Sequence, residues 1–171
     1  MQDGRLICAM LALSVIAFSC NINKQADAIK LSNDLSAAND SLAYYGKMWN
    51  EELKIAVNTS NFSNLKPIRT KLQDYINSKE AEVSAMHDIG GSEQMRHCEL
   101  DILGFEKNVV QNKFIVFEGF TDSSSDEQIT NAYRDLLQMT GQEEAKMANF
   151  QKLQDEYADK NDIPKPIGEI K

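Results

Sequence analysis

The sequence predicts an all-α fold, and more specifically an antiparallel four-helix bundle with up-down-up-down connectivity. Apolar residues recur at spacings of three and four in four long segments, which is the pattern of helices with one buried face. The chain has only 8 Gly and 3 Pro among 171 residues, and most of them fall where these segments end. Short connections favour antiparallel neighbours, which predicts the up-down-up-down order. We expect the bundle to occupy residues 28–160.

The first predicted helix, residues 24–57, has the most regular pattern. Its apolar positions step by three and four without a break: Ala28, Leu31, Leu35, Ala38, Leu42, Tyr45 and Trp49. Such a seam is typical of a helix packed nearly parallel to its neighbours. The segment 58–64 is rich in Asn and Ser, whose side chains compete for backbone hydrogen bonds, and it should end the helix.

The second helix is expected to begin near Ser63, with Pro67 tolerated in or near the first turn, where a missing N–H costs little. Its buried stripe is predicted to be Leu65, Ile68, Leu72, Ile76, Val83 and Met86. Gly90 and Gly91 should end this helix because glycine tolerates positive φ. Ser92 then suits the N-cap of the next helix.

The third predicted helix, residues 93–118, ends in the octamer KFIVFEGF at 113–120. This octamer is compatible with a helix or a strand, and we favour a helix because no partner strand is visible elsewhere. It contains Phe114, Phe117 and Phe120, which we expect to form core at one end of the bundle. Any exposed part of this cluster would mark a patch that binds a protein or an apolar ligand.

The fourth helix, residues 126–160, is expected to start with a capping box formed by Ser125 and Gln128. Its apolar stripe is predicted to be Ile129, Tyr133, Leu136, Met147, Phe150 and Tyr157. Thr140 and Gly141 weaken the middle of the helix and suggest a bend there. Residues 161–171 are interpreted as an extended or disordered tail, because two prolines forbid continued helix.

The N-terminus carries an apolar run from Leu6 to Phe18, which has the length of the core of a signal peptide. This run is shorter than the ~20 residues that a membrane-spanning helix needs. The run ends in AFSC, residues 17–20, which resembles the lipobox of bacterial lipoprotein precursors. In that family a small residue precedes a cysteine that is lipidated and becomes the mature N-terminus.

The resemblance implies a signal peptide at residues 1–19, acylation of Cys20 with palmitate among the acyl chains, and a lipid-attached tether at residues 20–27. The family usually has Leu and a small residue where this chain has Ala17 and Phe18. An ordinary signal peptide cleaved nearby, or a free cysteine in an N-terminal anchor, therefore remains an alternative. The expected location is the bacterial envelope, at the inner or outer membrane, facing the periplasm or the cell surface.

Composition narrows the classes of partner. Removing 19 of the 171 residues leaves 152, with Cys98 as the only thiol not consumed by acylation, so no intrachain disulfide is possible.

The removed part holds one acid and one base, so the formal charge stays at −8. An acidic surface disfavours nucleic acids and anionic lipid head groups. Membrane contact should therefore come from the acyl chains on Cys20.

No catalytic or cofactor motif is recognisable, so we predict a protein that is not an enzyme and needs no cofactor. Glu93 and His97 are four residues apart and could share a helix face. Two ligands make a weak site, since structural zinc typically takes four, and no metal is predicted, with these two as the weak candidates. A heme attachment motif is absent. Acidic neighbours of Cys98 should raise its thiol pKa and make it inert.

The leading hypothesis is a non-enzymatic envelope lipoprotein whose bundle binds an unidentified envelope protein. The alternative is a carrier or sensor that holds a small apolar ligand or a metal between the helices. Hydrolytic activity is the least supported reading, because the apolar seams reveal no buried polar cluster. The sequence leaves the oligomeric state open.

Overall fold

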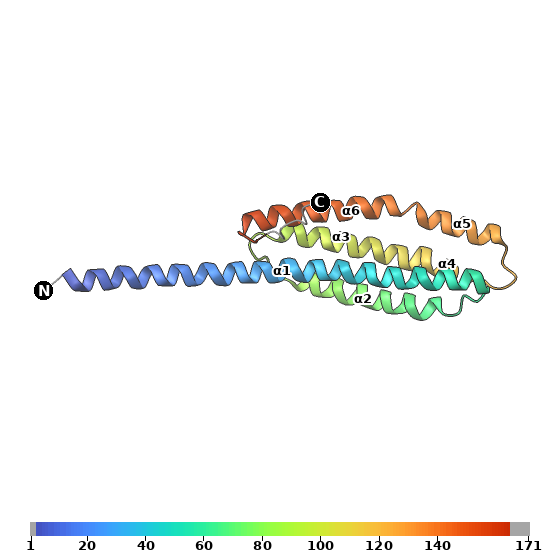
Figure 1. Cartoon of the computed structure of the whole chain (residues 1–171), viewed down its shortest axis with the longest axis horizontal. Helices are drawn as coiled ribbons and strands as arrows, with labels where there is room; N and C mark the ends of the chain where they lie inside the picture. The colour runs from blue at the N-terminus through green and yellow to red at the C-terminus, as the bar shows by residue number, and fades with distance from the viewer. Residues whose placement is uncertain (1–2, 165–171) are drawn as a thin grey trace, which may run out of the picture.

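In the computed structural model, the backbone is described for residues 3–164 and the side chains for residues 24–164. All regular secondary structure in this part of the chain is helical, as predicted, and four helical segments lie side by side (Figure 1). The elements in chain order are α1 (Asp3–Thr59), α2 (Leu65–Ala85), α3 (Glu93–Val109), η1 (Val110–Phe114), α4 (Ile115–Phe117), α5 (Asp126–Leu137) and α6 (Thr140–Lys160). The third segment runs through α3, η1 and α4, and the fourth through α5 and α6.

The seam predicted for the first helix is the buried face of α1. All of its members are buried except Tyr45, which is partly buried against the core, and the seam continues through Leu53 and Ala56. At its N-terminal end α1 continues beyond the bundle (Figure 1). The predicted signal peptide and the side chain of Cys20 lie outside the described side chains, as do residues 165–171 of the predicted tail.

The connection between α2 and α3 corrects two predictions. Gly90 and Gly91 have φ angles of 61° and 79°, but α2 already ends at Ala85, so the two glycines form the turn before α3 rather than the end of α2. Ser92 occupies the N-cap position, but its side chain makes no capping bond to α3. Its hydroxyl instead accepts from the backbone N–H of Ile89 at 3.2 Å and donates to Asp88 at 3.1 Å. The serine therefore stabilises the turn rather than the helix end.

The segment that could have been helix or strand is helical as far as Phe117. The sequence did not predict that η1 is a π-helical turn. Such a turn accommodates more residues than an α-helical turn and changes the phase of the residues that follow. Val110, Phe114 and Phe117, which are spaced four and three residues apart, all face the core.

An aromatic cluster closes one end of the bundle and joins α1 to η1 and α4. The rings of Trp49 and Phe114 are stacked with centroids 3.6 Å apart, and Phe117 meets Trp49 edge-on at 5.4 Å. Phe120 packs edge-on against Phe117 and Phe62, each at 5.7 Å. Phe114 and Phe117 are buried and Phe120 is partly buried, so the cluster lies in the core at the bundle end.

The fourth segment departs from a continuous helix. The capping box of Ser125 and Gln128 starts α5 as predicted, and the helix is interrupted at residues 138–139, just before the predicted bend. α6 packs against α3 and buries Phe150 and Tyr157, whereas α5 has no buried residue.

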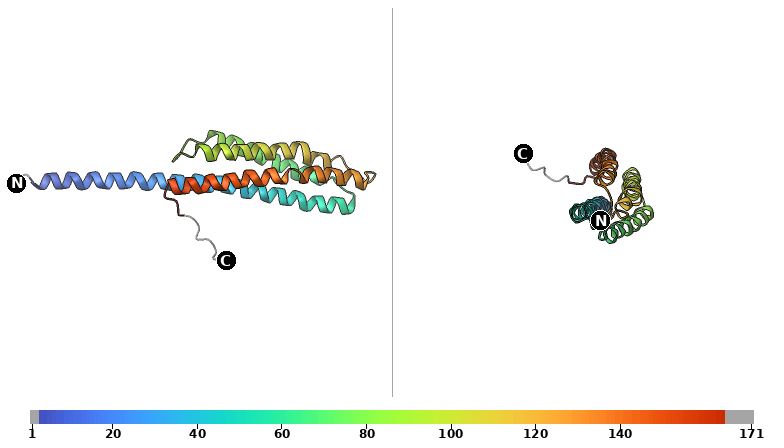
Figure 2. Two further views of the ribbon diagram at one scale, coloured as in Figure 1. Left: turned by 90° about the horizontal axis from the view of Figure 1, so that it is seen from above. Right: turned by 90° about the vertical axis from the view of Figure 1, so that its right-hand side faces the viewer.

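The backbone of α1 follows α2 closely, but it approaches α5 and α6 at isolated points at most. Figure 2 shows the four segments end-on. Tyr133 and Met147, expected in the buried stripe of the fourth helix, are 41% and 37% exposed. That expectation is wrong because α5 and the start of α6 do not close onto α1.

Candidate functional site

A cavity of about 470 Å³ lies where the fourth segment stands away from α1. Its walls come from α1, α5 and α6, and its floor comes from α3 and η1. We call it the main cavity. Most of its lining is apolar, including Leu42, Trp49, Ile102, Val109, Phe114 and Leu136. The volume falls in the range of small-molecule sites, which are concave, mostly apolar and furnished with a few polar groups.

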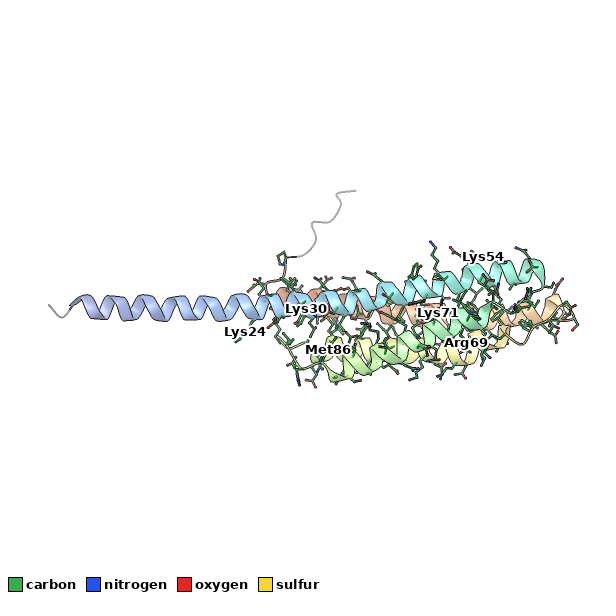
Figure 3. All side chains as sticks on the ribbon, turned by 90° about the horizontal axis from the view of Figure 1, so that it is seen from below. Lys24, Lys30, Lys54, Arg69, Lys71 and Met86 are labelled. Carbon is green, nitrogen blue, oxygen red and sulfur yellow. The ribbon has the colours of Figure 1, made fainter. Side chains whose placement is uncertain are left out.

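A second hollow of about 330 Å³, the side hollow, lies next to the main cavity and shares Asn50 and Tyr133 with it. Leu53 and Phe117 form part of its lining. Lys54 stands at its edge, fully on the surface (Figure 3). The two hollows follow one face of α1 over residues 39–58.

Small residues on α1 explain why space is left at this point. Gly46 lines the main cavity, and a Cβ atom added there would meet nothing within 4 Å. Ala43 lines the cavity one turn earlier. Across the gap, the break between α5 and α6 falls at Met139, which also lines the cavity. A short side chain on one wall and an interrupted helix on the other leave the interior open.

Two buried polar atoms on residues of the main cavity have no partner. The side-chain N–H of Asn39 donates to Glu99 at 2.9 Å, but the Asn39 Oδ1 atom accepts nothing. The indole Nε1 of Trp49 donates to nothing. These side chains are only 7% and 1% exposed. Each unpaired buried polar group costs ~1–3 kcal/mol. Both atoms are buried, so they lie behind the cavity wall rather than on its surface.

Glu106 places a carboxyl group on the floor of the main cavity. It is half-buried on α3, and no described side chain forms a hydrogen bond or ion pair with it. Burial raises its pKa to about 7, with a further contribution from Glu143. Glu143 lies at the more exposed rim, and partial burial followed by the charge of Glu144 raises its pKa too.

Behind the cavity, Glu99 is completely buried on α3. Burial raises its pKa to about 7, and the hydrogen bond from Asn39 and the charge of Lys79 offset only part of that effect. Its Oε1 atom has no partner. Glu99 therefore accepts a hydrogen bond from Asn39 with one oxygen, while burial destabilises its charged form.

The predicted binding patch lies beneath the two hollows. Phe114 lines the main cavity and Phe117 lines the side hollow, while Phe120 packs behind them. Their role in binding stays a prediction. Cys98 is buried, accepts a hydrogen bond from Asn149 at 3.3 Å, and has a thiol pKa raised mainly by burial.

The weak metal candidates Glu93 and His97 are both exposed on α3. Among the residues that the structure describes, no three potential metal-ligating side chains come together. The structure thus gives these two residues no third ligand in the described part of the chain.

Sequence reasoning missed the acidic residues of the site, although a signal was present. Glu99 and Glu106 continue the stripe of Met95, Ile102 and Val109 at alternating steps of four and three. A carboxylate on an apolar stripe is a candidate for a buried functional group. Asn39 gave less warning, because it is adjacent to the seam rather than part of it.

Comparison of the chain with protein-family models, with curated proteins and with solved structures found no match. None of the helices in the described part of the chain is long and apolar enough to span a membrane.

Proposed function

We propose that this chain is a non-enzymatic binding protein, held at a bacterial envelope membrane by acyl chains on Cys20, whose bundle holds a small apolar molecule in the main cavity. The observation that supports a carrier or sensor is the combination of an apolar space of about 470 Å³ with the carboxyl group of Glu106, which no described side chain pairs, on its floor. A cavity that only reflected loose packing would have no need of polar atoms. A ligand-binding site needs a few of them to orient its ligand.

The lining favours binding over catalysis. It offers carboxylates, amides, the hydroxyls of Tyr133 and Thr140 and the amine of Lys47, but neither a histidine nor a cysteine among the described residues. The thiol of Cys98 lies outside the lining, and its raised pKa keeps it protonated. The site therefore has groups that hold a ligand and lacks an activated nucleophile of the common kind.

Docking of an envelope protein is the second candidate function. Several large apolar side chains are exposed on α1, on α4 and at the end of α5: Ile55, Val57, Ile115, Val116 and Leu137. Exposed apolar groups that cluster on one region often mark a protein-binding surface. This role and ligand binding are compatible, because the side hollow adjoins Val57.

We infer that the four segments alternate in direction, as in an up-down-up-down bundle. Contacts between residues far apart in sequence support this. Arg69 near the start of α2 pairs with Glu118 just after α4, and Gln25 on α1 bonds to the backbone of Asp162 after α6 at 2.5 Å. Tyr157 near the end of α6 donates to Ile89 before α3 at 2.9 Å. Each pair joins the start of one segment to the end of another.

Membrane attachment through Cys20 is tested by fractionation of cells. Replacing Cys20 with alanine should move the protein from the membrane fraction to the soluble envelope fraction, because the acyl chains provide the attachment. The Cys98→Ala variant is the matched control and should stay with the membrane. Because Cys20 precedes Ala28 by eight residues, the bundle should lie within ~12 Å of the acylation point if that stretch is helical. Membrane retention of the Cys20→Ala variant would show that the anchor assignment is wrong.

Ligand binding is tested by filling the cavity from α1. A leucine at Gly46 should occupy the space without a clash, because a Cβ atom there meets nothing within 4 Å. It should also favour the helix by up to ~1 kcal/mol. We expect the variant to fold and to lose at least about tenfold in affinity for the neutral apolar dye N-phenylnaphthylamine, a loss that corresponds to ~1.4 kcal/mol of binding free energy.

The Gly104→Leu variant is the matched control for this experiment. Gly104 is an exposed residue of α3 whose added Cβ would also meet nothing, and it lines neither hollow. It should bind the dye as the unchanged chain does. Equal dye binding by the Gly46→Leu and unchanged chains, or no dye binding by the unchanged chain, would contradict the proposed carrier function.

A further inference from the structure

We propose that the main cavity selects cationic amphiphiles, molecules with an apolar body and a protonated amine, and that Glu106 holds the ammonium group. This inference rests on the proposed carrier function and specifies the ligand class. It starts from the contradiction between an apolar cavity and the carboxyl group on its floor. A carboxylate in such a place is costly unless a cation or several hydrogen-bond donors compensate it.

The chain itself does not supply that compensation. No described side chain forms an ion pair or hydrogen bond with Glu106, and the only other charged groups that line the cavity are Lys47 on α1 and Glu143 on α6. Lys47 is 74% exposed and faces Glu51 on its own helix at 3.9 Å. Tyr133 is the titratable residue that α5 contributes to the lining. Two carboxyl groups against one solvated lysine make the site suited to a cation rather than to a fatty-acid carboxylate.

The acidic groups of the lining fit the same class of ligand. An ammonium group has three donors and no acceptor. The carboxylate of Glu106 takes one of them, and Glu143 offers a second carboxyl group at the rim of the cavity.

The volume of the main cavity indicates how large the apolar body of the ligand can be. A water molecule occupies ~30 Å³ of liquid volume, so 470 Å³ corresponds to about 15 water-sized groups. A dodecyl chain with one head atom is of this order. The formal charge of −8 also raises the local concentration of cations around the whole chain.

The test compares dodecylamine, dodecanol and dodecanoate, which share one apolar chain and differ in head-group charge. Binding to the full chain in phosphatidylcholine nanodiscs is followed by the fluorescence of Trp49, which is the single tryptophan of the sequence and lines the cavity. The ligands are kept below the concentrations at which they form micelles. We expect dodecylamine to bind roughly tenfold or more tightly than dodecanol, and dodecanoate to bind least, because a charge-assisted hydrogen bond is stronger than a neutral one.

The Glu106→Gln variant should lose this preference and bind dodecylamine and dodecanol within about twofold of each other. It removes a buried charge and keeps the shape of the side chain, so we expect it to fold. Lys47→Gln is the control at the rim and should keep the preference. Acidification from about pH 8 to about pH 5.5 should weaken dodecylamine binding and leave dodecanol binding unchanged, because Glu106, with a pKa of about 7, loses its charge over this range while the amine stays protonated.

The outcomes separate the two proposals. Binding of dodecanol that is blocked by Gly46→Leu, together with no preference for the amine, would overturn the cationic ligand class and leave the carrier function supported. A preference for the amine that persists in Glu106→Gln would overturn the role of Glu106. Absence of binding by all three compounds would overturn both proposals.

Discussion

Replacing Trp49 with alanine should lower the free energy of unfolding by about 3 to 5 kcal/mol, the usual cost of removing a large aromatic side chain from a core. Trp49 is 1% exposed, stacks on Phe114 and meets the edge of Phe117. The substitution therefore removes the ring that joins α1 to η1 and α4. The main cavity already adjoins Trp49, so we do not expect neighbouring side chains to fill the space that the ring leaves.

One feature of Trp49 should moderate the loss. Its indole N–H is buried without a partner, so the substitution also removes an unsatisfied donor. We therefore expect a value towards the lower end of the range. Urea unfolding followed by circular dichroism measures it, since the variant has no tryptophan to follow by fluorescence.

The control for this measurement lies on the same helix. Tyr44 is 61% exposed, and its replacement by alanine should change stability by no more than ~0.5 kcal/mol. A Trp49→Ala variant as stable as the Tyr44→Ala variant would show that the aromatic cluster does not hold the bundle end together.

The second large effect concerns Glu99, whose replacement by glutamine should stabilise the fold at about pH 8 by about 3 kcal/mol. Burial raises the pKa of Glu99 in the folded chain to about 7 from its ordinary value of 4.5. Below the unfolded value the carboxyl is protonated in both states, and its contribution to stability is fully present. As the pH rises towards 7, the unfolded chain ionises while the folded chain keeps its proton, so stability falls.

The magnitude follows from the width of this pH window. The loss is at most ~1.4 kcal/mol for each pH unit between the two pKa values, and it is complete once the pH exceeds the folded value of about 7. Solvent screening does not reduce it greatly, because Glu99 is fully buried. Glutamine does not ionise, yet its carbonyl can still accept from Asn39. The variant should therefore match the parent chain near pH 4 and exceed it in stability at pH 8.

Urea unfolding at a series of pH values checks this expectation. Glu106 shifts in the same direction, so the Glu99→Gln variant should keep a smaller decline of stability with pH rather than none. Glu93→Gln, an exposed change on the same helix, should follow the parent chain throughout. A parent chain whose stability rises between pH 5 and pH 8, or a Glu99→Gln curve parallel to the parent's, would contradict the buried-carboxylate account.

Periodicity identified most of the fold because each helix buries a continuous stripe. The unbroken seam from Ala28 to Trp49 predicted the buried face of α1, and Gly90 and Gly91, with positive φ, marked the connection between α2 and α3. The capping box at Ser125 located the start of α5. In these places the local chemistry and the tertiary structure require the same residues.

The π-helical turn and the separation of α5 from α1 could not be predicted from such local patterns. A π turn depends on how Phe114 and Phe117 fit against Trp49 on another helix, which no local pattern records. The stripe of Tyr133 and Met147 is as apolar as a buried stripe, yet both residues stay partly exposed because α1 presents Gly46 and Ala43 opposite them.

The sequence by itself determined the helices and the buried face of α1, because these depend on residue spacing. Only the tertiary structure decided that Asn39 and Trp49 of α1 lie at the same cavity as Glu106 of α3, since this depends on how the helices pack around the small residues of α1. A stripe specifies which side of a helix seeks burial. It does not specify how closely the facing helix approaches, and that distance creates the site.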